Sequence, residues 1–272
     1  MFLGVPLSSL SRALAERYGY RAILMYRNPY VCFWHSVSAV YADTMANRLC
    51  NAMLMAGVGR GERIIVLSEN MPECIYVSLA AYKAGIVVVP VFPGTCTARL
   101  EAIARITGAR LVFAGGAEQY AMAAGLYAKC PTVRRVVVFD PEVAIRRNDK
   151  TTRHIAEFVK NAPGRIRQNL AQPCADDAAD IIFTSGTMGE PKGVVITHGM
   201  YSAAFMENAG RIEVGEGWKV LEYLPYNHIF ERAWALFCLQ CGAVLVVNQR
   251  ASHLQRALRE IRPEAMCCVP HF

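Results

Sequence analysis

The chain has 272 residues, of which 54% are hydrophobic and 19% are charged, so it can bury a substantial core and is not a disordered protein. Its net charge of +7 comes from scattered basic residues without any long basic run, which argues against a nucleic-acid-binding protein. The length lies near the roughly 250 to 300 residues at which a single core stops growing, so one large domain or two subdomains are both allowed.

The sequence also indicates a cellular compartment. The longest apolar window, 233–247, is interrupted by Gln240 and is shorter than the roughly 20 residues of a membrane-spanning helix, so we expect no transmembrane segment. The first residues lack the basic leader of a secretory signal, and ten scattered cysteines are typical of reduced thiols. We therefore expect an intracellular protein, either cytoplasmic or peripheral on a membrane. We interpret Cys238 and Cys241 as buried structural thiols, because no second cysteine pair follows at a metal-binding spacing.

Helix-like and strand-like segments alternate along the first half of the chain. Apolar residues at spacings of three and four predict helices over 9–18, 38–55, 72–83, 98–107 and 117–128. Short β-branched runs between them predict buried strands over 63–67, 86–91, 110–113 and 135–139. This alternation predicts an α/β fold, in which doubly wound, mostly parallel sheets carry helices on both faces.

A polar stretch over 141–179 interrupts this order and contains one predicted helix, over 152–161. Strands are then predicted over 180–184, 193–197, 219–224, 243–247 and 265–269. The helices predicted among them cover 199–209, a stretch from about 229, and 252–261. We therefore divide the chain into an N-terminal α/β subdomain (1–140), a polar connecting region (141–179) and a second α/β subdomain (180–272).

The segment FTSGTMGEPKG, residues 183–193, connects two of these predicted strands and is rich in glycine and hydroxyl residues. Glycines let backbone N–H groups turn towards an anion, and Lys192 adds a positive charge, so a polyphosphate would suit the loop. The same composition equally fits an ordinary surface turn. The Walker A pattern does not match, because Gly193 follows the lysine and a strand follows the loop.

This loop resembles the signature loop of the adenylate-forming superfamily, which includes acyl-CoA synthetases, the adenylation domains of peptide synthetases and the luciferases. The family pattern is an aromatic residue followed by Thr-Ser-Gly-Thr-Thr-Gly-x-Pro-Lys-Gly, and Met188 stands where the family usually has a second Thr. Residues 57–95 also resemble the family's N-terminal subdomain, with Asn70 as the expected cap of a helix that begins near Pro72. The resemblance implies an incomplete large N-terminal domain of an acyl-CoA synthetase-like fold.

A second motif, LPYNHIFERAW, spans residues 224–234 and follows a predicted strand. Ligands of open α/β sheets bind beyond the carboxyl ends of strands, so His228 is a candidate site residue. A histidine in this place is otherwise a capping or core residue more often than a functional one. The motif is similar to the second core motif of the superfamily, and its HIFER ending looks most like long-chain fatty acyl-CoA synthetases. The resemblance implies that His228 is catalytic and lies beside the reacting carboxylate.

The resemblance implies a two-step reaction with small-molecule partners and no nucleic acid. The carboxylate of an acid, expected to be a long-chain fatty acid, attacks the α-phosphate of Mg-ATP to give an acyl-adenylate and pyrophosphate. The thiol of coenzyme A then displaces AMP. The residues that the resemblance assigns to the ATP phosphates are Thr184, Ser185, Gly186, Thr187, Met188, Gly189 and Lys192. Thr184 would also help to hold Mg²⁺.

Other family motifs do not occur in the 272 residues. We find no Tyr-Gly-x-Thr-Glu motif, whose Glu would share the Mg²⁺, no later ribose-binding Asp and no C-terminal catalytic lysine. We therefore expect the chain to match the N-terminal half of a longer enzyme and to have incomplete activity alone. Two alternatives stay open: a nucleotide-binding pseudoenzyme, favoured by Met188, and a structural or partner-binding protein that keeps only the fold.

Overall fold

The computed structural model describes residues 4–27, 30, 33–166, 170–184 and 191–269. The helices are α1 (Leu7–Tyr18), α2 (Ala39–Met55), α3 (Pro72–Ala84), α4 (Thr97–Thr107), α5 (Ala117–Ala124), α6 (Ile155–Phe158), α7 (His198–Ala209), α8 (Ile229–Cys241) and α9 (Leu254–Ile261), with a 3₁₀ turn at Ala251–His253. The strands are β1 (Ala22–Arg27), β2 (Trp34–Ser38), β3 (Arg63–Leu67), β4 (Val87–Val91), β5 (Leu111–Ala114), β6 (Arg135–Val138), β7 (Thr152–His154), β8 (Ala178–Thr184), β9 (Lys192–Thr197), β10 (Lys219–Glu222), β11 (Val244–Val247) and β12 (Ala265–Met266).

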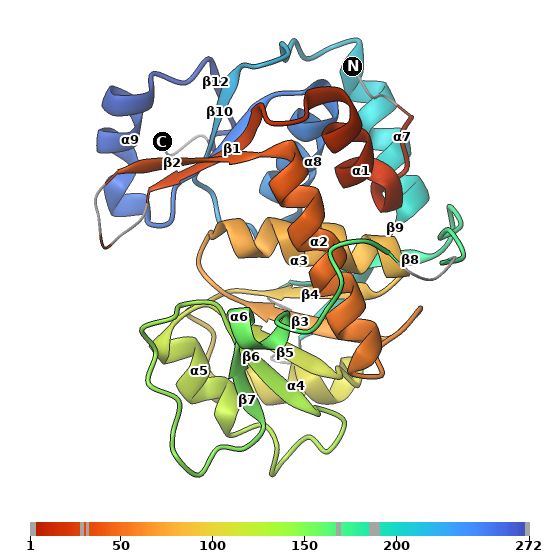
Figure 1. Cartoon of the computed structure of the whole chain (residues 1–272), viewed down its shortest axis with the longest axis vertical. Helices are drawn as coiled ribbons and strands as arrows, with labels where there is room; N and C mark the ends of the chain where they lie inside the picture. Colours follow the sequence, from red (N-terminus) through yellow and green to blue (C-terminus); the bar gives the residue numbers. More distant parts are fainter. Residues whose placement is uncertain (1–3, 28–29, 31–32, 167–169, 185–190, 270–272) are drawn as a thin grey trace.

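The strands form two sheets, seen in the lower and upper halves of Figure 1. A seven-stranded sheet has the order β7-β6-β5-β3-β4-β8-β9, and a five-stranded sheet has the order β12-β10-β11-β1-β2. Neighbouring strands are parallel except for the antiparallel pairs β8/β9 and β1/β2. Each sheet therefore draws strands from both sides of the 141–179 stretch, and the subdomain boundaries at 140 and 180 stay a prediction.

Alternating side chains place apolar residues on both faces of the seven-stranded sheet. In β3, Ile64 and Val66 join the core that also holds α1, α2, α3 and α8, whereas Ile65 and Leu67 join the core beneath α4 and α5. A smaller core lies between the five-stranded sheet and α9. Helix α3 lies between the two sheets (Figure 1), so the predicted arrangement of mostly parallel sheets with helices on both faces is confirmed.

Local sequence signals explain where α3 begins and ends. Pro72 occupies its first turn, where a missing N–H costs nothing, and Gly85 follows its last residue with a left-handed φ of 63°. No described helix is both long and apolar enough to cross a membrane.

The structure corrects one predicted element and adds two strands. The predicted helix over 152–161 is a short strand, β7, followed by the single turn α6. The Asp149 carboxylate accepts hydrogen bonds from the amides and hydroxyls of Thr151 and Thr152, and this turn leads directly into β7, which pairs with β6. Strands β1 and β2 were not predicted, although they complete the five-stranded sheet through the β1/β11 pair.

Candidate active site

The ladder between β8 and β9 brings two predicted site residues together. Thr184 ends β8, Lys192 begins β9, and the two residues face each other in the antiparallel register, which places their Cα atoms about 4.5 to 5.5 Å apart. Both residues are exposed. The other predicted phosphate-binding residues, Ser185, Gly186, Thr187, Met188 and Gly189, lie outside the described residues.

The last glycine of the motif has a packing role in this ladder. Gly193 lies opposite Phe183, and a Cβ added to it would come within 2.9 Å of the Ile181 side chain and 3.1 Å of the Phe183 ring. A larger residue would therefore push these side chains aside. Glycine at this position lets the hairpin close beneath the Phe183 ring.

Arg99, in the first turn of α4, is a neighbour of this hairpin that the sequence motifs did not indicate. Its guanidinium donates a hydrogen bond of 2.9 Å to the Thr184 carbonyl oxygen. Thr184, Lys192 and Arg99 thus bring a hydroxyl, an ammonium group and a guanidinium to the loop end of the β8–β9 hairpin. This set of donors suits a polyphosphate. No group of three or more His, Cys, Asp or Glu side chains that could hold a metal ion occurs among the described residues.

His228 occupies the N-cap of α8, just beyond the carboxyl end of β10. Its Nδ1 atom accepts a hydrogen bond of 3.2 Å from the Phe230 amide, and its side chain is exposed. Because Nδ1 accepts, the neutral ring carries its proton on Nε2, which is left as a donor towards solvent. Within the described part of the chain, His228 makes no hydrogen bond or ion pair with Thr184 or Lys192. The capping role that the sequence left open is therefore observed.

Asn70 was expected to cap α3, and this prediction is wrong. Met71 is the N-cap of α3, without a side-chain capping bond. The buried Asn70 amide instead donates to the Leu224 carbonyl oxygen at 2.8 Å, and its oxygen accepts from the Tyr226 amide at 2.9 Å. These two bonds satisfy backbone groups of the irregular turn before His228, which has no strand or helix partner of its own.

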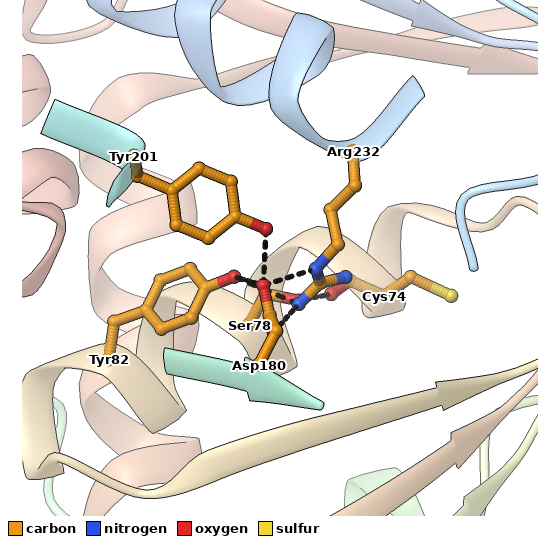
Figure 2. A network of polar contacts seen from close by, with 6 residues as sticks. All are labelled: Cys74, Ser78, Tyr82, Asp180, Tyr201 and Arg232. Carbon is orange, nitrogen blue, oxygen red and sulfur yellow. Dashed lines mark hydrogen bonds and ion pairs between the residues drawn. The ribbon is translucent and has the colours of Figure 1, made fainter. Parts of the chain in front are cut away.

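A network of buried polar side chains joins β8 to helices α3, α7 and α8 (Figure 2). The Arg232 guanidinium of α8 donates to both carboxylate oxygens of Asp180 in β8, each at 2.8 Å. The same group donates to the Ser78 hydroxyl at 3.0 Å and the Tyr82 hydroxyl at 2.9 Å, both on α3. Tyr82 and Tyr201, the latter from α7, donate in turn to Asp180. We call Ser78, Tyr82, Asp180, Tyr201 and Arg232 the polar junction.

Because the polar junction is buried, its charged and hydroxyl groups rely on one another as bonding partners. Asp180 is 0% exposed and Arg232 is 1% exposed, so each charge depends on the other for compensation. Burial, as the largest cause, raises the pKa of the Tyr82 and Tyr201 hydroxyls well above the ordinary value of 10.0, so both remain donors at neutral pH. The guanidinium also lies 4.7 Å from the ring centroid of Tyr226, in the turn before His228.

Two further carboxyl groups are buried near this junction. Burial raises the pKa of Glu222, at the end of β10, and of Glu231, in the first turn of α8, above the ordinary glutamate value of 4.5. We expect both to be largely neutral at pH 7. Cys238 and Cys241 are buried free thiols of α8, as predicted.

The chain was compared with known protein families and with curated proteins. The family model described as AMP-binding enzyme matches residues 13–272. The chain is 26% identical to fatty acyl-CoA synthetase A of Dictyostelium discoideum, covering 86% of this chain and 36% of that protein. It is 30% identical to 3-hydroxybenzoate–CoA ligase of Aromatoleum sp. (strain CIB), covering 78% of this chain and 39% of that protein. The chain thus spans less than half the length of these relatives.

Solved structures share the fold. The N-terminal domain of FACL13 from Mycobacterium tuberculosis has a TM-score of 0.81 at 24% identity, covering 98% of this chain and 63% of that one. The anthranilate CoA ligase AuaEII has a TM-score of 0.84 at 18% identity, covering 97% of this chain and 49% of that one. The resemblance to the N-terminal half of an acyl-CoA synthetase, drawn from the two sequence motifs, is confirmed.

Proposed function

The chain belongs to the family of AMP-binding enzymes, and from this we propose that it serves the ATP-dependent activation of a carboxylic acid to an acyl-CoA through an acyl-adenylate. The observation that carries the proposal is the register that sets Thr184 opposite Lys192 at the loop end of the β8–β9 hairpin. As substrate we propose a long-chain fatty acid, supported by the HIFER motif and by the fatty acyl-CoA synthetase among the relatives.

Each described site residue has a role in this proposal. Lys192 binds the phosphates and stabilises the negative charge that develops on the departing pyrophosphate. Arg99 holds the Thr184 backbone in place. The Nε2–H group of His228 donates a hydrogen bond to the carboxylate of the acid. Mg²⁺ would neutralise phosphate charge, and the Thr184 hydroxyl fits as one ligand among water and phosphate oxygens.

The cellular site is also a proposal. We propose an intracellular protein, because all the cysteines in the described part of the chain are free thiols. Peripheral membrane contact stays a prediction from the sequence alone.

Two assays on the same protein test the function. Calorimetry measures ATP binding with Mg²⁺, and a pyrophosphate-release assay with palmitate, ATP and coenzyme A measures turnover. We expect the 272 residues to bind ATP but to make no acyl-CoA alone, and turnover to appear only when a segment that carries the later family motifs is added. Binding without turnover in the extended protein would favour a pseudoenzyme, and no binding in either form would favour a structural protein.

A further inference from the structure

We propose that the Asp180–Arg232 ion pair positions the His228 turn against the strand that carries Thr184. The turn comprises residues 223–228, between β10 and α8. This inference rests on the proposed function, because the relative placement of Thr184 and His228 matters only if both act on the same substrates. Asp180 and Arg232 are thus positioning residues, which act through other groups.

The two partners of the ion pair are close in the chain to the two candidate sites. Asp180 precedes Thr184 by four residues in the same extended strand, a distance of about 13 Å. Arg232 lies one helical turn after His228, and its amide donates to the His228 carbonyl oxygen at 3.1 Å. The ion pair therefore joins the two segments four residues from Thr184 along β8 and four residues from His228 along α8.

The guanidinium also contacts the turn itself. One of its faces lies over the Tyr226 ring, while its N–H groups bond Asp180. The Tyr226 amide is held in turn by the Asn70 side chain. A continuous series of contacts thus runs from β8 through Arg232 to the turn that precedes His228. A shift of Arg232 would move the turn relative to β8.

The Asp180–Arg232 ion pair contributes more to the orientation of the His228 turn than to the stability of the fold. A buried pair has to offset the desolvation of both charges, and apolar residues of similar volume are often as stabilising. The bidentate contact, in contrast, fixes the plane and direction of the guanidinium relative to the carboxylate. Hydroxyls from Tyr82 and Tyr201 hold the same carboxylate from two other helices.

The test neutralises the pair without leaving a buried charge. Asp180→Asn with Arg232→Met keeps an acceptor for the tyrosine hydroxyls and an unbranched side chain against Tyr226. The matched control is Asp43→Asn with Lys83→Met, which removes an ion pair of 2.9 Å between α2 and α3 whose lysine is buried and whose aspartate is partly buried. Denaturant unfolding, amide hydrogen exchange and calorimetric titration with ATP are measured for both double variants and the wild type.

We expect the amides of Tyr226 and Phe230 to exchange about tenfold faster in the Asp180/Arg232 variant, and its ATP affinity to fall about tenfold. The Asp43/Lys83 variant should match the wild type in both measurements. Unchanged exchange in the Asp180/Arg232 variant would overturn the inference, as would faster exchange with unchanged ATP affinity. If the wild type binds no ATP but exchange still rises, the proposed function fails while the structural coupling stands.

A milder variant covers the case in which the first does not fold. Arg232→Lys keeps a cation beside Asp180 but loses the bidentate contact and the planar guanidinium face over Tyr226. We expect faster exchange at the same two amides and weaker ATP binding, each by about threefold. Equal exchange in this variant and the wild type would again overturn the inference.

Discussion

Strand β8 contributes to both the polar junction and the loop end of the β8–β9 hairpin, but the polar side chains at these two places differ in how they are hydrogen-bonded. Asp180 accepts from three side chains and is fully buried. Four residues later, the Thr184 hydroxyl is exposed, and neither it nor the Lys192 ammonium makes a hydrogen bond or ion pair with another described residue. The polar junction thus pairs its own charges, whereas the loop end of the hairpin leaves donors available where a ligand would bind.

Removal of one partner of the Asp180–Arg232 ion pair should have the largest effect on stability. It tests the description of the polar junction as fully paired. Arg232→Ala leaves the Asp180 carboxylate buried and uncompensated, so we expect the free energy of unfolding to fall by about 3 to 5 kcal/mol. Denaturant unfolding measures the change. Lys192→Ala should change it by less than about 0.5 kcal/mol. A loss in the free energy of unfolding below about 1 kcal/mol for Arg232→Ala would show that Asp180 does not depend on Arg232 for charge compensation.

A pH dependence should follow from the buried carboxyl groups beside the junction. Because the pKa values of Glu222 and Glu231 are raised in the folded protein, the unfolded chain loses its protons first as the pH rises past 4.5. Stability is therefore greatest below this value and falls as the pH rises through the raised values, by about 1.4 kcal/mol per pH unit for each proton retained.

Thermal unfolding between about pH 5 and 9 measures this slope. Glu222→Gln with Glu231→Gln should flatten it, because neither amide titrates. The exposed Glu213→Gln is the matched control and should leave the slope unchanged. A double variant with the wild-type slope would assign the pH dependence to other groups.

Lys192 tests the other half of the comparison, the exposed loop end of the β8–β9 hairpin. Lys192→Ala removes a charge-assisted bond to phosphate, so we expect ATP or pyrophosphate to bind roughly tenfold to a hundredfold more weakly, with the fold intact. Calorimetry provides the affinities. Lys160→Ala, an exposed lysine after α6, is the control. Equal losses of affinity in Lys192→Ala and Lys160→Ala would indicate that the overall positive charge of the protein attracts the nucleotide, and that Lys192 is not part of a specific phosphate site.

The smallest effect is expected at Met188. Met188→Thr restores the hydroxyl that the family usually has at this position, and one neutral hydrogen bond contributes about 0.5 to 1.5 kcal/mol. We therefore expect nucleotide affinity to rise by less than about tenfold, as measured in the same titration. Weaker binding would show that the loop has adapted to the thioether side chain.

Sequence periodicity predicted most of the fold because buried strands and amphipathic helices carry local patterns. It could not predict the role of Asn70, whose partners, Leu224 and Tyr226, lie more than 150 residues away in the chain. Arg99 was missed for the same reason, because its contact with Thr184 depends on the packing of α4. Thr184, Lys192 and His228 came from motifs, and their joint action on one substrate stays a prediction.

The pairing of β1 with β11 has a consequence for synthesis of the protein. Leu24 pairs with Leu245, so the β1–β2 hairpin leaves the ribosome long before its partner strand exists. At a translation rate of about 5 to 20 residues per second, this interval lasts roughly 10 to 45 s. An apolar strand edge is open during that time, and such edges associate with other chains. Nascent chains should therefore be most prone to aggregation, and most dependent on chaperones, before β11 emerges.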